Sequence, residues 1–185
     1  MRKVTREEIV DFMTWDDRRP TERPRILAMK EPRRLTAGPI TVLVENTDTV
    51  RYQVQEMMRI ERIVRDADIQ HELNTYNELL GGDGTIGTVI LIEIDDPDER
   101  RVKLKEWTAL PEHIYLELAD GTRIRGQFDG RQIEDGKLSS VQYVIFDVGG
   151  KVPVAMGSDM PSLDVRLDLS DAQRGALAED LGASA

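Results

Sequence analysis

The 185-residue chain contains no cysteine, which excludes disulfide bonds, thiolate catalysis, iron–sulfur ligation by this chain and the common structural zinc sites. Aromatic residues are scarce, at 5%. The longest apolar run, residues 89–92, is far too short to span a membrane. The N-terminus shows no secretion signal, because charged residues lead directly into a helical pattern. We therefore expect a cytoplasmic protein with no membrane association.

Motifs for the common chemistries are absent as well. The glycines of residues 81–84 close a predicted helix, whereas a phosphate-binding loop opens one. Neither histidine belongs to a Glu-x-x-His turn, and we interpret His71 as a surface residue and His113 as a polar strand residue. No Gly-x-Ser-x-Gly motif is present. We therefore expect no metal and no cofactor, and the absence of motifs disfavours an enzyme without excluding one.

The charge of the chain is strongly negative, with a formal net charge of −10. A field of this sign repels phosphate, so we expect no nucleic-acid partner. Residues 1–34 differ from the rest, because they hold ten Lys/Arg against seven Asp/Glu and leave −13 for the remainder. This basic helical N-terminal segment could dock on an acidic partner or on the body of the chain itself.

The first part of the chain has the pattern of helices around one strand. A capping box opens a helix over about residues 6–15, and a short helix that starts at a proline ends at Pro32. Residues 39–45 are β-branched and apolar, which predicts a strand. A central helical pair then covers about residues 48–65 and 69–80.

The second part changes to the two-residue period of β-strands. Residues 148–162 hold three glycines and two prolines, which predicts a surface loop, and a second capping box opens a C-terminal helix over 170–181. We expect one domain over 1–185, with an α+β fold in which an antiparallel sheet of about five strands packs against the central helical pair, with N- and C-terminal helices. The predicted strands of this part are 88–94, 113–118, 123–128, 140–147 and 163–167.

The helix over 48–65 has two polar residues on its apolar face. Glu61 falls in the middle of that face and Gln53 near its edge. Because burial of an unpaired carboxylate costs several kcal/mol, we expect Glu61 to pair with Arg65 or to line a polar pocket, unless the helical phase differs. In the pocket hypothesis Glu61 is a general base. The candidate pocket consists of Gln53, Glu61, Glu93 and Gln142.

A second set of polar and aromatic residues indicates an interaction surface. Part of it lies on the opposite wall of the same helix, and part lies on the polar face of the strand predicted over 113–118. Aromatic and charged residues together on exposed faces are typical of contact sites. The candidate interaction surface consists of Tyr52, Glu56, Arg59, Ile63, His113, Tyr115 and Glu117.

The sequence contains four characteristic runs, at residues 44–63, 76–80, 112–117 and 140–144. Together they resemble the bacterial domain-of-unknown-function 3501 family, and the resemblance covers roughly residues 2–147. Residues 148–185 match nothing in that pattern, so we expect any role of theirs to be specific to a subfamily. Members of the family are often encoded near rubrerythrin-like di-iron proteins and iron–sulfur oxidoreductases. The resemblance therefore implies, by association, an accessory role in redox metabolism.

Three functional hypotheses follow from these features. The first is a non-catalytic accessory or binding protein that acts with a rubrerythrin-like or iron–sulfur redox partner through the candidate interaction surface. The second is a small-molecule-binding enzyme or sensor with a pocket between the helix 48–65 and the sheet. The third is a structural homo-oligomer subunit that associates through the Tyr52 and Ile63 face.

Overall fold

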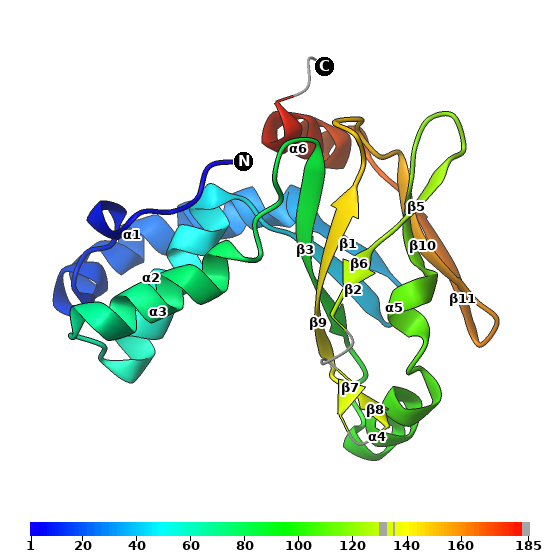
Figure 1. Cartoon of the computed structure of the whole chain (residues 1–185), viewed down its shortest axis with the longest axis horizontal. Helices are drawn as coiled ribbons and strands as arrows, with labels where there is room; N and C mark the ends of the chain where they lie inside the picture. The colour runs from blue at the N-terminus through cyan, green and yellow to red at the C-terminus, as the bar shows by residue number, and fades with distance from the viewer. Residues whose placement is uncertain (130–132, 135, 183–185) are drawn as a thin grey trace.

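A computed structural model describes residues 1–129, 133–134 and 136–182 of the chain. The fold is α+β, as the sequence predicts, and it has two parts: a helical arm and a body of two antiparallel sheets (Figure 1). The arm projects from one side of the sheets, so that helices and strands meet at a wide angle. Two adjoining cavities lie between the arm and the five-stranded sheet.

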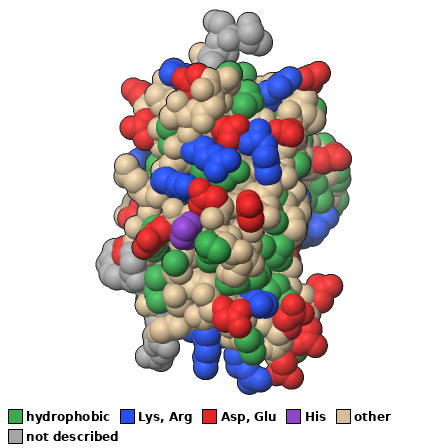
Figure 2. All heavy atoms as spheres, turned by 90° about the vertical axis from the view of Figure 1, so that its right-hand side faces the viewer, with side chains coloured by type: hydrophobic (Ala, Val, Ile, Leu, Met, Phe, Trp, Pro, Cys, Tyr) green, Lys and Arg blue, Asp and Glu red, His purple; other side chains and the backbone are tan. Residues whose placement is uncertain are grey.

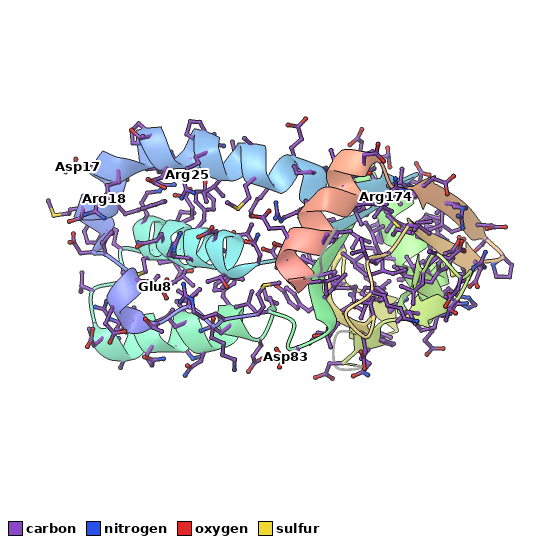
Figure 3. The ribbon with its side chains drawn as sticks, turned by 90° about the horizontal axis from the view of Figure 1, so that it is seen from above. Glu8, Asp17, Arg18, Arg25, Asp83 and Arg174 are labelled. Carbon is purple, nitrogen blue, oxygen red and sulfur yellow. The ribbon has the colours of Figure 1, made fainter. Side chains whose placement is uncertain are left out.

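Three helices form the arm, together with a short 3-10 turn, η1, at Arg6–Glu8. Seen from above, α2 runs between α1 and α3 (Figure 3). α2 therefore buries two walls at once: Val50, Val54 and Met58 pack with α3, while Tyr52 packs with α1. The bounds of these helices are Phe12–Lys30 for α1, Thr47–Glu61 for α2 and Asp66–Asn77 for α3.

α1 corrects the sequence prediction for the N-terminal segment. Only the end of the predicted helix over 6–15 is helical, because residues 6–8 form the turn η1; residues 12–15 and the short helix before Pro32 belong to one 19-residue helix that starts at Phe12 and passes through Pro20 and Pro24. Proline inside a helix removes a backbone hydrogen bond, which is why the pattern indicated a break. Packing overrides this local preference, because α1 buries Trp15 and Ile26 against α2.

The body consists of a five-stranded and a four-stranded sheet whose facing sides enclose the main core. Every strand pair is antiparallel. Core-facing positions alternate along β9, where Gln142, Val144 and Phe146 are buried. In sheet order, the strands are β1 (Arg34–Ala37), β2 (Ile40–Val44), β3 (Thr85–Ile92), β9 (Val141–Asp147) and β6 (Gln127–Phe128), then β11 (Leu163–Asp168), β10 (Ala155–Met160), β4 (Ile114–Glu117) and β5 (Arg123–Arg125).

Shorter elements complete the body. α6 lies where the arm joins the sheets and carries the C-terminal end of the described chain (Figure 1). No helix in the part of the chain that the structure describes has both the length and the apolar character needed to cross a membrane. The remaining elements are η2 (Glu31–Arg33), α4 (Pro97–Glu106), α5 (Leu110–His113), β7 (Ile133–Glu134), β8 (Lys137–Leu138) and α6 (Asp171–Leu181).

The prediction that residues 148–162 form a surface loop is wrong, because β10 occupies Ala155–Met160 and lies inside the four-stranded sheet. The glycines that suggested a loop have two separate roles. Gly149 and Gly150 adopt positive φ in the turn before β10, whereas Gly157 sits within the strand under a tyrosine ring. The sequence pattern predicted one sheet of about five strands, whereas the structure has a second sheet of four strands that includes β10.

Two close contacts fix the arm to the body. A Cβ atom at Gly87 of β3 would lie 1.8 Å from the carbonyl oxygen of Leu79, so only glycine lets the end of the α3 segment cross the sheet here. On the other side, the buried Arg33 donates to both carboxylate oxygens of Asp180 in α6, at 2.7 and 2.9 Å. Asn46, the N-cap of α2, also donates to Asp180, at 3.0 Å. These contacts set the position of α2 and α3 against the sheet.

Candidate functional site

The outer face of the four-stranded sheet carries a lattice of charged side chains. In the strand register, Tyr115 lies opposite Arg125 on one side and Gly157 on the other, and Gly157 lies opposite Arg166. Figure 2 shows basic and acidic side chains gathered on this side of the molecule beside a histidine. We call this region the charged strand face and define it by His113, Tyr115, Glu117, Arg123, Arg125, Asp159 and Arg166.

Asp159 on β10 holds one end of the charged strand face. Its carboxylate pairs with both terminal nitrogens of Arg125, one of them at 3.1 Å, and lies 2.9 Å from Nδ1 of His113. Arg123 contributes a longer contact of 3.6 Å. The hydrogen bond from Arg125, followed by that from His113, lowers the pKa of Asp159 well below its usual range. Asp159 therefore stays ionised at neutral pH and fixes the side chains around it.

At the other end of the charged strand face, the carboxylate of Glu117 on β4 likewise fixes the side chains around it through ion pairs. Its Oε2 accepts from Arg166 Nη1 at 2.7 Å and from Arg123 Nε at 3.2 Å. These two cations, Arg166 first, lower the pKa of Glu117. The carboxylate thus bridges β11 and β5 across the sheet face, and it orients two guanidinium groups that remain more than a third exposed to solvent.

Tyr115 lies at the centre of the charged strand face and is only 1% exposed. The guanidinium carbon of Arg123 lies 4.2 Å from the centroid of its ring, and that of Arg125 lies 5.5 Å away. On the other side of the ring, a Cβ atom at position 157 would lie 2.6 Å from the Tyr115 hydroxyl, so Gly157 is needed for the ring to lie flat. The face of the Tyr115 ring therefore packs against two arginine side chains and holds them in place.

The concave region between arm and body forms a second candidate site. Two adjoining cavities, of about 370 Å³ and 200 Å³, share Tyr76, Leu79 and Tyr143 in their walls. The floor is the outer face of the five-stranded sheet, where Leu43, Val89 and Tyr143 form one register row. We call this region the arm–sheet cleft. Its other lining residues are Lys30, Glu45, Val50, Gln53, Thr75, Glu78, Thr88, Gln127, Asp129, Val141, Val144 and Ile145.

The polar groups of the arm–sheet cleft come mainly from the end of β2 and from the arm helices α2 and α3. Glu45 lies at the end of β2, is 7% exposed, and accepts a short hydrogen bond from the Thr49 hydroxyl. Tyr76 faces the cavity from α3, and burial raises its pKa, while a hydrogen bond with Gln53 acts in the opposite direction. The cleft thus combines an apolar floor with a few oriented polar groups, as ligand sites do.

The structure separates the four residues of the candidate pocket. Gln53 lines the arm–sheet cleft, but Gln142 points to the core between the sheets, where it is 1% exposed and donates to the Ser139 carbonyl. Glu93 is exposed outside the cleft and accepts from Thr41 and Arg34. The structure therefore places only Gln53 at the predicted pocket between helix and sheet.

The expectation that Glu61 points to the core is wrong. α2 ends at Glu61, and Arg62 adopts a left-handed conformation with φ of 51°. Neighbouring residues on the predicted apolar face, Ile60 and Val64, are 63% and 70% exposed. Glu61 itself is exposed, and its expected partner Arg65 pairs with Asp68 instead. The buried wall of α2 runs through Val50, Val54 and Met58, so the predicted apolar stripe leaves this wall in the last turn of the helix, before Ile60 and Glu61.

The part of the candidate interaction surface that lies on α2 is covered by α1. Tyr52 is 9% exposed and meets Trp15 edge to face, with ring centroids 5.9 Å apart. Glu56 accepts from Trp15 Nε1 and Arg19 Nε, both at 2.8 Å. Arg59 extends the same cluster toward Asp16, and Ile63 packs against the inner core of the arm. The predicted partner face of this helix is therefore an internal contact.

The part on β4 behaves differently, because Tyr115 and Glu117 share the outer face of the strand and His113 precedes it at the end of α5. Three cations that complete the charged strand face, Arg123 and Arg125 on β5 and Arg166 on β11, were not predicted from the sequence. The alternation Arg-Ile-Arg at 123–125 carried a usable signal, but the partner strands were unknown. Among the described residues, no group of three or more His, Asp or Glu side chains is arranged to hold a metal ion.

The chain is similar to a solved structure and to a protein family. A solved structure of a protein of unknown function from Burkholderia pseudomallei matches with a TM-score of 0.88 and 25% identity, over 97% of this chain and all of that one. No curated protein matches the chain. The model of a family of proteins of unknown function, DUF3501, matches residues 3–181. The match corrects the expectation that residues 148–185 lie outside the family pattern, because it extends to the end of α6. The chain therefore belongs to the DUF3501 family of proteins of unknown function.

Proposed function

We propose that the protein is a non-catalytic accessory protein that docks a partner protein through the charged strand face. The observation that carries this proposal is the fixed arrangement of Arg123, Arg125 and Arg166 around Tyr115. Each of the three arginine side chains is 40–43% exposed. A guanidinium group has five N–H donors and forms strong hydrogen bonds to carboxylates such as those of a partner protein. Arginine and tyrosine are also the residue types that contribute most to protein interfaces.

Stability alone does not account for this arrangement. An exposed ion pair contributes about 0 to 1 kcal/mol, so a lattice of them is a weak source of folding energy. A lattice does hold long side chains in one geometry before a partner arrives, and such pre-organisation lowers the entropic cost of binding. This favours a contact surface over a purely structural role.

The partner class that we propose is a redox protein of the rubrerythrin-like or iron–sulfur type. The support is the family resemblance and its association with genes for such proteins. This chain has no cysteine with which to hold an iron–sulfur centre itself. A docking role would therefore place this protein beside the redox centre of another chain.

The test is a comparison of partner capture by three forms of the purified protein. The double variant Arg123→Ala/Arg166→Ala removes two guanidinium groups from the charged strand face. Arg174→Ala is the matched control, because Arg174 lies on α6 (Figure 3) and is 44% exposed, with an ion pair to Asp171. We expect the wild-type chain and Arg174→Ala to retain the same partner and the double variant to lose it. Equal retention by all three forms would rule out docking at this face.

The second candidate function is a small-molecule-binding protein that uses the arm–sheet cleft. The larger cavity, of about 370 Å³, favours it, because pockets for small ligands start at about 300 Å³, and the smaller cavity adjoins it. Gln53 and Tyr76 supply hydrogen-bonding groups above an apolar floor. A screen of small ligands against the wild-type chain, read by chemical-shift changes at cleft residues, tests this candidate.

A further inference from the structure

We infer that the arm–sheet cleft takes a small organic cation, such as an ammonium group on an apolar body. The inference rests on the second candidate function and names its ligand class. It is carried by the position of Glu45, a buried carboxylate at the cleft wall, and by the two tyrosines that form the adjoining walls.

Glu45 is buried without a counter-ion. It is 7% exposed, and no described Lys, Arg or His nitrogen lies within 4.0 Å of its carboxylate. The Thr49 hydroxyl and the positive end of α2 stabilise the charge in part. Neither of them supplies a full positive charge, and an unpaired buried carboxylate costs several kcal/mol. A cationic ligand in the cavity would offset that cost.

The walls of the arm–sheet cleft suit the same ligand. Tyr76 and Tyr143 line both cavities, and the faces of aromatic rings attract cations. Glu78 adds a further carboxylate to the lining of the larger cavity. The apolar floor of Leu43 and Val89 would contact the carbon body of the ligand. Charge and shape therefore favour the same class of molecule.

Lys30 also lines the smaller cavity and is the competing explanation. Its Nζ lies over the Tyr52 ring, 5.6 Å from the centroid, and not within 4.0 Å of any described carboxylate. In this position Lys30 contacts the Tyr52 ring on α2 and does not neutralise the carboxylate of Glu45. If Lys30 were the counter-ion of Glu45 in solution, an added cation would have no carboxylate to meet.

Three matched probes test the inference: choline, its uncharged dimethylbutanol isostere and the dimethylbutanoate anion. Their binding is followed by chemical-shift titration of the wild-type chain and of three variants. Glu45→Gln removes the charge and keeps the shape of the side chain. Tyr143→Ala removes one aromatic wall at a position that is 47% exposed, so it preserves the fold. Glu93→Gln is the control, a carboxylate on the same sheet outside the cleft.

We expect choline to shift cleft resonances, with affinity about tenfold lower in Glu45→Gln and Tyr143→Ala and unchanged in Glu93→Gln. If the neutral and anionic probes bind as well as choline and Glu45→Gln has no effect, the inference of a cation is overturned while a ligand-binding cleft stands. If none of the three probes perturbs the cleft, both the inference and the second candidate function are overturned.

Discussion

Replacement of Arg33 by alanine tests how the arm is fixed to the sheets. Arg33 is 4% exposed and donates to Asp180 at 2.7 and 2.9 Å, to Glu179 at 3.1 Å and to the Met29 carbonyl at 2.9 Å. The Asp180 side chain is itself only 6% exposed. In Arg33→Ala, Asp180 would keep Asn46 as a donor and lose its buried counter-ion.

The magnitude follows from that uncompensated charge. Removal of one partner from a buried ion pair costs about 3 to 5 kcal/mol, which for a chain of this size lowers Tm by about 10 °C. Urea denaturation measures the loss as a lower midpoint at constant slope. The exposed pair of Arg174 and Asp171 provides the control, because Arg174→Ala should cost less than about 1 kcal/mol.

A double-mutant cycle separates the ion pair from the packing of the Arg33 side chain. If the pair carries the effect, Arg33→Ala/Asp180→Ala will be clearly less destabilised than the sum of the two single variants, because no charge remains buried alone. Additive effects, or a loss of less than about 1 kcal/mol in Arg33→Ala, would refute the reasoning. In that case α6 would be held mainly by its apolar contacts.

Three further predictions concern single residues. Gly87→Ala should lower the free energy of unfolding by about 3 kcal/mol, since its Cβ would lie 1.8 Å from the Leu79 carbonyl oxygen; an unchanged urea midpoint would contradict this. Arg2 lowers the pKa of Glu8 from 4.5 to about 2, so Glu8 contributes stability that is present above pH 4.5 and is lost as the pH falls toward 2. Glu8→Gln should therefore flatten the acid side of the stability profile in urea titrations at a series of pH values, and a parallel profile would count against the ion pair. Trp15→Phe should cost about 1 to 3 kcal/mol, because Glu56 loses the buried indole donor at 2.8 Å, and thermal unfolding measures the change.

The sequence predicted the fold class because local patterns agree with the tertiary structure in most segments. Capping residues located the helix starts: Asn46 caps α2 and Ser170 caps α6, each with a side-chain acceptor for a backbone amide. The strand predicted over 140–147 agrees with β9 at Val141–Asp147. These signals depend only on neighbours in the sequence.

The misplaced elements are those whose local signals tertiary contacts override. Gly157 reduced the strand character of residues 155–160, yet it is there because the Tyr115 ring lies over it. Pro20 and Pro24 indicated a break in α1, yet packing on Tyr52 keeps the helix continuous. No pattern within these segments shows which distant side chain will lie against them.

The candidate site could be predicted only in part for the same reason. The polar side of β4 could be recognised from the sequence. The arginines that complete the charged strand face, Arg123 and Arg166, lie on other strands and reach Glu117 only through strand pairing. On α2, an isolated helix offers two equivalent walls, and only the packing of α1 shows that the Tyr52 wall is internal. The arm–sheet cleft depends on the angle between the two parts, which no single segment determines.

The most direct test of the account is whether the charged strand face carries partner binding. The measurement is affinity capture with the wild-type chain, Arg123→Ala/Arg166→Ala and Arg174→Ala in parallel, followed by identification of the retained proteins and their iron content. We expect an iron-containing redox protein to be retained by the wild-type chain and by Arg174→Ala, and to be lost with the double variant. Retention of the same protein by the double variant, or the absence of an iron protein from all three samples, would contradict it.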